Sequence, residues 1–148
     1  MATYTQILYQ IIFSTKDRVK SIEEEKQQLL FNYIWGIIKN NKCHLYRING
    51  MDDHLHILTH LHPSIALSEL IKDIKVSSSK MIKEEEIFPK FNGWQIGYGA
   101  FTYSIDAKQK LIDYIINQKE HHKKLSFVDE YKNILKEFEI EFDEQYLF

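Results

Sequence analysis

Two histidines flank a single leucine in His54-Leu55-His56, inside the apolar run HLHILTH. Residues two apart on a β-strand project from the same face, so both imidazoles would point to one side of a sheet and Leu55 to the other. Two imidazoles on one face suit a divalent metal ion. A hard ion such as Mg²⁺ or Mn²⁺ needs oxygen ligands as well, so a further donor must come from elsewhere in the chain.

A His-x-His pair alone is weak evidence for a metal site. Such a pair more often represents two polar side chains that find local partners. The same spacing recurs in His60 and His62, at the end of the apolar run and next to Pro63. We interpret this second pair as solvent-facing side chains and not as ligands.

A second pair of polar side chains, Tyr114 and Gln118, lies four residues apart in the segment DYIINQKEHH. On a helix this spacing puts both side chains on one face, one turn from each other. Gln118 offers an amide oxygen, which is an acceptable ligand for a hard cation, and Tyr114 offers a phenol. Without the histidine pair, a tyrosine at the edge of a helix packing surface would be the better interpretation of Tyr114.

The strands and helices that would position these groups follow from the hydrophobic pattern. Strand-like composition or alternation is found in residues 4–14, 43–48, 54–61 and 99–105. The second and third segments flank the turn sequence NGMDD, so we expect an antiparallel hairpin that carries the histidines. Helical spacing predicts helices over residues 21–40, 64–86, 108–124 and 128–138. The second of these would bury one face, made of Leu67, Leu70, Ile71, Ile74, Ser78 and Ile82.

The expected helix starts have recognisable capping residues. Ser21 followed by Glu24 resembles a capping box, and Ser64 and Asp106 are suited to cap the helices that follow them. The order β-α-β-β-α-β predicts an α+β, ferredoxin-like fold: an antiparallel sheet with helices on one face and an extra C-terminal helix that carries Tyr114.

We expect a single domain over residues 1–148. Its parts would be a ferredoxin-like core over 1–105, a tyrosine helix over 106–125 and an acidic C-terminal tail over 126–148. In the tail, the alternation of Phe138, Ile140 and Phe142 suggests a strand that packs against the body or a partner.

Composition narrows the class of protein. The only cysteine, Cys43, excludes an intrachain disulfide and opens an apolar run as a core residue would. No apolar stretch approaches the length of a membrane span and the N-terminus lacks the features of an export signal, so we predict a cytoplasmic protein with no membrane partner. The net charge of −2 combines a basic body with an acidic tail, which weakens the objection to nucleic-acid binding.

Three motifs occur in order along the chain: GMDDHLH at 50–56, WQIGYG at 94–99, and Tyr114-x-x-x-Gln118. Together they resemble the HUH single-tyrosine transposases of the insertion sequence 200/605 family, over essentially the whole chain. The combination is more specific than either the histidine or the tyrosine motif alone. The resemblance implies a DNA transposase that cleaves and rejoins single-stranded DNA at transposon ends through a 5′-phosphotyrosine intermediate.

The resemblance also implies roles for particular residues. His54, His56 and Gln118 would hold one Mg²⁺ or Mn²⁺ ion, and Tyr114 would be the nucleophile. The implied partners are single-stranded DNA with terminal hairpins and a second copy of the chain, in a homodimer whose active sites are shared between subunits. Basic and polar candidates for DNA contact are Lys16, Arg18, Lys72, Lys75, Lys119, His121 and Lys123. For any single lysine, a solvated helix face is an equally good interpretation.

Two other functions remain open from the sequence. A non-catalytic nucleic-acid-binding module on the same fold, with its histidines satisfied locally, would bind hairpins without cleaving them. A related replication initiator or host-domesticated nuclease would use the same chemistry for a different biological purpose.

Overall fold

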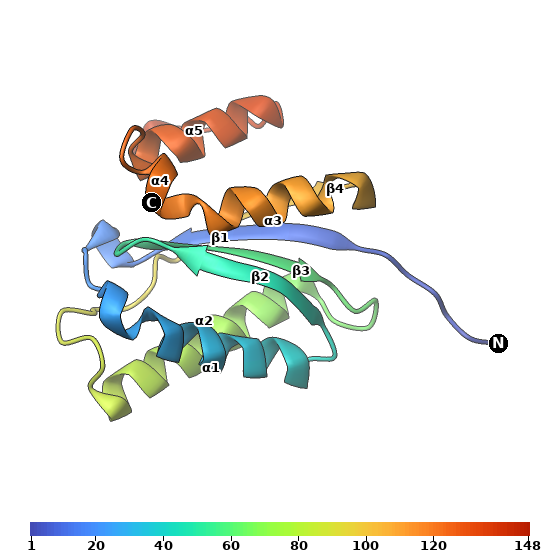
Figure 1. Ribbon diagram of the computed structural model, residues 1–148, viewed down its shortest axis with the longest axis horizontal. Helices are drawn as coiled ribbons and strands as arrows, with labels where there is room; N and C mark the ends of the chain where they lie inside the picture. The colour runs from blue at the N-terminus through green and yellow to red at the C-terminus, as the bar shows by residue number, and fades with distance from the viewer.

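The computed structural model describes residues 1–148, and a four-stranded sheet forms its centre (Figure 1). The strands are β1 (Leu8–Ser14), β2 (His44–Gly50), β3 (His54–His60) and β4 (Gly99–Tyr103), in the spatial order β2-β3-β1-β4. β1 pairs with β3 and β4, β2 pairs with β3, and all three pairings are antiparallel. This order is that of a ferredoxin-like sheet, so the predicted fold class is confirmed.

One face of the sheet is covered by α1 (Gln27–Asn40) and α2 (Leu67–Glu85), as Figure 1 shows. Phe13 of β1 and Leu55 of β3 belong to the apolar cluster on this side, together with buried residues of both helices. The face predicted for α2 is the buried one, and its buried members are Leu70, Ile71, Ile74, Ser78 and Ile82. Cys43 is also buried in this cluster, as predicted.

The other face of the sheet is covered by α3 (Lys108–Ile116), α4 (Gln118–His121) and α5 (Phe127–Glu137) (Figure 1). Leu8 and Ile12 of β1 contribute to the two apolar clusters on this side. β1 is therefore buried on both faces, between two helical layers. None of the helices combines the length and the apolar character that crossing a bilayer requires.

Several predicted boundaries are wrong, and the serines expected to cap helices have other partners. β1 begins at Leu8 and not at residue 4. α1 begins at Gln27, after a 3-10 turn, and the Ser21 hydroxyl donates to the carbonyl of Val19 instead of capping a helix. α2 begins at Leu67, and the hydroxyl of Ser64 lies 2.7 Å from Nδ1 of His62.

The helix predicted over residues 108–124 is divided into two. A 3-10 turn occupies Ile105–Ala107 and Asp106 caps no helix there. α3 then ends at Ile116, and Asn117, with φ −90° and ψ 18°, separates it from α4. The helix direction can therefore change between Tyr114 and Gln118.

The acidic tail packs on the body, but not as a strand. Glu139 has a φ of 56°, which interrupts the extended backbone that the alternating pattern suggested. Phe138 and Phe142 pack against the cluster formed by α5 and β4, with Leu147 and Phe148, whereas Ile140 is exposed.

Gly50 ends β2 at the turn that leads to His54, and the structure leaves no space for a side chain there. An added Cβ would lie 2.2 Å from the carbonyl oxygen of His54. We expect Gly50→Ala to shift this turn and to lower the free energy of unfolding by about 1–3 kcal/mol. Urea unfolding measures the loss.

The matched control is Gly36→Ala in the middle of α1, where an added Cβ meets no atom within 4 Å. There the same change should raise the free energy of unfolding by about 0.5–1 kcal/mol, because alanine favours the helix. Effects of the same sign at both positions would contradict the steric explanation.

Candidate active site

β3 presents His54 and His56 on the face of the sheet that α3, α4 and α5 cover. Both side chains are fully buried, and their ring centroids are 5.2 Å apart. Leu55 and Ile57 point the other way, into the cluster under α1 and α2. The alternation of the strand therefore directs both imidazoles into one layer, as the sequence predicts.

Each imidazole is held at Nδ1 by an oxygen acceptor. Nδ1 of His54 lies 2.7 Å from Oδ1 of Asp53, and a carboxylate only accepts hydrogen bonds. Nδ1 of His56 lies 2.9 Å from Oε1 of Gln10, whose amide nitrogen donates to the hydroxyl of Tyr103 at 2.9 Å. Both Nδ1 atoms therefore carry hydrogen, and in the neutral rings both Nε2 atoms present lone pairs. Proteins orient histidine ligands of metal ions with second partners of this kind.

Tyr114 of α3 and Gln118 of α4 reach the same place from the other side. Gln118 is fully buried, and its Oε1 lies 3.2 Å from Nε2 of His54. The ring centroid of Tyr114 is 6.0 Å from that of His56. The structure thus brings the predicted nucleophile and the three predicted metal ligands together within one chain.

Glu130 of α5, which lies in the segment predicted to be an acidic tail, also enters this site. Its side chain is 2% exposed, and its Oε1 lies 3.0 Å from Nε2 of His56 and 3.1 Å from Nε2 of His122. Ligand atoms of His54, His122 and Glu130 all lie within 4.8 Å of one another, so these three residues can hold a metal ion.

One signal in the sequence points to Glu130. On α5 it shares the buried face with Phe127, Tyr131 and Ile134, where an acid is expensive to bury unless it has partners. His122 has no comparable signal, since it lies in the run KEHHKK.

The buried charges in the site shift one another's pKa values. Burial raises the pKa of the Tyr114 phenol, and the charge of Glu130, to which its hydroxyl donates, raises it further. Burial alone would raise the pKa of Glu130, but the imidazoles of His122 and His56 beside it hold it well below its usual range. Burial lowers the pKa of His56, whereas the hydrogen bond to Glu130 outweighs burial at His122 and raises its pKa.

We expect acid to destabilise the metal-free protein. Below pH 6.5 His56 takes up a proton in the unfolded chain, whereas in the folded protein its lowered pKa keeps it neutral. Below pH 4.5 the unfolded chain protonates Glu130 while the folded carboxylate stays ionised. The free energy of unfolding therefore decreases as the pH is lowered, by at most about 1.4 kcal/mol per pH unit for each group. His122 acts in the opposite sense, because its contribution is lost as pH rises through its raised folded pKa.

Urea unfolding with EDTA between pH 7 and pH 4 checks this expectation. Glu130→Gln should flatten the dependence below pH 4.5, the usual pKa of the carboxyl. Glu137→Gln removes an exposed charge from the same helix and should leave the dependence unchanged. Stability that rose on acidification from neutral pH would contradict the assignment.

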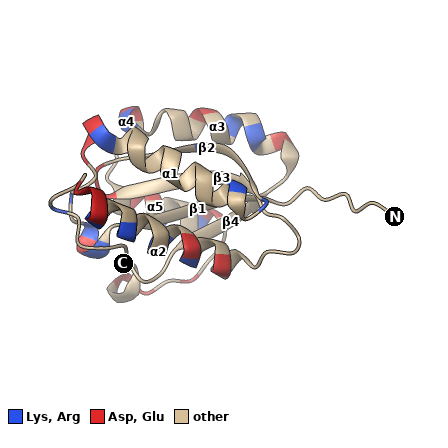
Figure 2. Cartoon of the chain, turned by 90° about the horizontal axis from the view of Figure 1, so that it is seen from below, with Lys and Arg blue, Asp and Glu red and all other residues tan.

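The residues predicted to contact DNA are dispersed, and several already have partners. Nζ of Lys119 donates to Oε1 of Gln27 at 3.2 Å and to Oδ1 of Asn49 at 3.3 Å. Lys123 pairs with the exposed Glu120. In Figure 2, basic and acidic residues are interspersed along the helices and do not gather on one face.

Two of the other predicted DNA-contacting residues lie against aromatic rings. The His121 ring stacks on Tyr114 with centroids 4.5 Å apart, and its buried Nε2 has no hydrogen-bond partner. Arg18 lies 5.0 Å over the ring of Phe148 in the tail. Lys16 lines the cavity beneath that tail.

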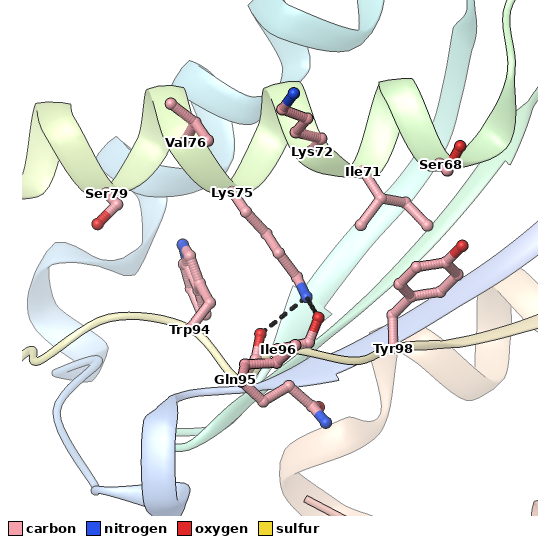
Figure 3. A pocket seen from close by; sticks show the side chains of 10 residues that line it. All are labelled: Ser68, Ile71, Lys72, Lys75, Val76, Ser79, Trp94, Gln95, Ile96 and Tyr98. Atoms are coloured by element: carbon pink, nitrogen blue, oxygen red, sulfur yellow. Dashed lines mark hydrogen bonds between the residues drawn. The ribbon is translucent and has the colours of Figure 1, made fainter.

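α2 covers the face of the sheet opposite the histidines, and Figure 3 shows Lys72 and Lys75 on this helix. Lys75 reaches from the helix to the WQIGYG segment, and its Nζ donates to three carbonyls there, those of Gln95, Ile96 and Gly97. Burial lowers the pKa of Lys75 to about 8. Lys75 thus anchors this loop beside a cavity of about 440 Å³, and a contact with DNA stays a prediction.

Comparison with known proteins supports the fold. The crystal structure of a candidate transposase from Deinococcus radiodurans R1 is 24% identical to this chain, and the match covers 80% of this chain and 95% of the other, with a TM-score of 0.62. A REP-associated tyrosine transposase bound to a REP hairpin is 14% identical, with 84% of this chain and 76% of the other covered and a TM-score of 0.63. No curated protein matches the chain.

The family follows from a more direct match. The family model described as "Transposase IS200 like" matches residues 3–118. This segment contains the whole sheet, both histidines of β3 and Tyr114, and it ends at Gln118. The chain therefore belongs to the IS200-like transposase family.

Proposed function

We propose that this protein is a DNA transposase that cleaves and rejoins single-stranded DNA at transposon ends through a 5′-phosphotyrosine link to Tyr114. The observation that carries the proposal is the position of Tyr114 beside His54, His56 and Gln118 in a chain of the IS200-like family. A nucleophile next to a cation site is what transfer of a phosphodiester to an enzyme side chain requires.

The chemistry needs a proton acceptor as well as a nucleophile. In cleavage, a bond forms between the Tyr114 oxygen and phosphorus, the bond from phosphorus to the 3′ oxygen breaks, and that oxygen leaves as a hydroxyl after taking up a proton. The phenol proton has an acceptor in place, because the Tyr114 hydroxyl donates to Oε2 of Glu130. Attack of a 3′-hydroxyl on the phosphotyrosine rejoins the strand by the reverse steps.

Mg²⁺ or Mn²⁺ is the proposed cofactor, with His54, His56 and Gln118 among its ligands. The donor set fits a divalent ion, since both imidazoles direct Nε2 inward and the Gln118 oxygen lies close to one of them. When bound, the ion supplies positive charge to a nonbridging phosphate oxygen.

Tyr114 lines a cavity of about 440 Å³, through which a ligand could reach its hydroxyl. The cavity is lined by residues of α3 and α5, among them Tyr114, Glu130 and Lys110. We propose that DNA approaches here and that its phosphates are neutralised by the basic and polar residues predicted from the sequence: Lys16, Arg18, Lys72, Lys75, Lys119, His121 and Lys123. Binding should therefore weaken as salt concentration rises.

The proposed substrate is single-stranded DNA with terminal hairpins. One structural relative is described as bound to a REP hairpin, which supports this choice. We further propose that the protein works as a homodimer, on the basis of the family resemblance.

One alternative function has an observation in its favour. His56 and His122 have hydrogen-bond partners in Glu130, as expected if the histidines are satisfied locally in a non-catalytic DNA-binding module. Such a module would bind hairpins without cleaving them, and binding would not respond to metal ions.

A cleavage assay separates the two functions. Labelled single-stranded oligonucleotides copied from both sides of the protein's own gene, with their hairpins, are incubated with protein and Mn²⁺ or Mg²⁺. We expect cleaved strands and a covalent protein adduct, both lost with EDTA and absent with duplex DNA. Hairpin binding that leaves every strand intact would contradict the transposase assignment and favour the binding module.

A further inference from the structure

Five ligand-type atoms converge between β3 and the C-terminal helices. They are the Nε2 atoms of His54, His56 and His122 and the Oε1 atoms of Gln118 and Glu130. The Glu130 oxygen lies 3.0 Å from the His56 nitrogen, 3.1 Å from that of His122 and 3.6 Å from that of His54. The Gln118 oxygen lies 3.2 Å from the nitrogens of both His54 and His122.

Most of these atoms present lone pairs to one another. The Nδ1 hydrogens of His54 and His56 are taken by Asp53 and Gln10, so their neutral Nε2 atoms are acceptors. The Gln118 oxygen is an acceptor too, because its amide nitrogen donates to Oε2 of Glu130 at 3.1 Å. Acceptors this close repel one another unless a positive species lies among them. That species is either a proton on an imidazole or a metal ion.

Burial favours the metal ion. His54, His56 and Gln118 are fully buried and Glu130 is 2% exposed, so little water can reach the space between these acceptors. A divalent ion would be balanced by two carboxylates, Glu130 within the cluster and Asp53 behind His54. The other titratable groups that face the cluster are His122, which follows α4, and Tyr114 on α3, whose phenol is neutral.

We propose that Glu130 and His122 are metal ligands in addition to His54, His56 and Gln118, and that this set binds first-row transition-metal ions such as Mn²⁺ in preference to Mg²⁺. Three of the five donors are imidazole nitrogens, which transition-metal ions accept readily. Mg²⁺ prefers oxygen ligands and retains several water molecules, for which five protein donors leave little room. The proposal deepens the metal-dependent function proposed above.

Both added ligands lie beyond residue 118, where the match to the family model ends. Their placement depends on α5, which is fixed in two ways. Ser126 caps its first turn by accepting from the backbone nitrogen of Asp129 at 3.2 Å. Phe127 stacks on the His54 ring, with centroids 3.9 Å apart and the rings 8° from parallel. Glu130, one turn further along, is thereby directed at the histidines.

Titration of the metal-free, full-length protein with Mn²⁺ tests the proposal without any DNA. The electron paramagnetic resonance signal of free Mn²⁺ reports binding, and Mg²⁺ is then added as competitor. We expect Glu130→Gln and His122→Ala to weaken Mn²⁺ binding at least about tenfold. Glu130→Asp, which keeps the charge, should retain more affinity than Glu130→Gln. Glu137→Gln and His44→Ala remove exposed side chains and should bind as the wild type does.

For the wild type, displacing half of the Mn²⁺ should require at least about a tenfold excess of Mg²⁺. Unchanged or tighter Mn²⁺ binding by both Glu130→Gln and His122→Ala, or displacement by equimolar Mg²⁺, would overturn the proposal. Circular dichroism of each variant shows whether it is folded. If the wild type binds Mn²⁺ through Glu130 but cuts no DNA, the proposed function fails and the metal site stands. If the wild type cuts DNA but the Glu130 and His122 variants bind Mn²⁺ as tightly as the wild type, the proposed metal ligands are wrong and the proposed function stands.

Discussion

Tyr114→Phe protein is expected to form no covalent adduct with DNA and to cleave single-stranded hairpin substrates at least about a thousandfold more slowly than the wild type. Phenylalanine has the same ring but no oxygen with which to form the bond to phosphorus. The fold should survive, since Glu130 keeps the hydrogen bond from the amide of Gln118 and its contacts with His56 and His122. Loss of activity would then reflect loss of the nucleophile.

Denaturing gels of labelled oligonucleotides measure both effects, because a covalent adduct retains the label on the protein. Tyr33→Phe is the matched control: it removes a hydroxyl from an exposed tyrosine of α1, on the opposite side of the sheet. The control should cleave at the wild-type rate. Mn²⁺ binding should be retained in Tyr114→Phe, since the phenol is not among the proposed ligands. An adduct formed by Tyr114→Phe would assign the nucleophile to another residue.

The sheet and the histidine pair could be predicted because they depend on local patterns. The alternation in β3 fixes which side chains share a face, and the NGMDD turn fixes the pairing of β2 with β3. His54 and His56 therefore follow from sequence spacing, as does the buried face of α2. Helix starts were less predictable, because Ser21 and Ser64 use their hydroxyl groups within turns.

The rest of the site depends on packing between segments far apart in the chain. Glu130 meets His56 only because α5 folds back over the face of the sheet that α1 and α2 leave open. The orientation of Gln118 and His122 likewise depends on the helix break at Asn117. No helix-breaking residue such as proline marks this break in the sequence. Helical spacing related Tyr114 to Gln118, but it could not reveal the carboxylate that both side chains contact.

His56→Ala is expected to lower cleavage at least about a hundredfold, because it removes a proposed metal ligand, leaves Oε1 of Gln10 without its partner and takes one of several partners from Glu130. The same assay reports this loss, and His44→Ala on the neighbouring strand provides the control.

A mixture of His56→Ala and Tyr114→Phe proteins then tests which subunit supplies the tyrosine and which the histidines of each active site. If subunits share active sites, as the resemblance implies, one mixed site contains both an intact tyrosine and intact histidines.

We expect no recovery in this mixture. Within one chain, Tyr114 already contacts Glu130, and Glu130 in turn contacts His56. Moving α3 into a partner would break the hydrogen bond from Tyr114 to Glu130, and leaving a polar group unsatisfied in this buried site costs about 1–3 kcal/mol. Recovery of activity would show that exchange of α3 between subunits is favourable despite this cost. The active form would then differ from the single-chain arrangement in the position of α3.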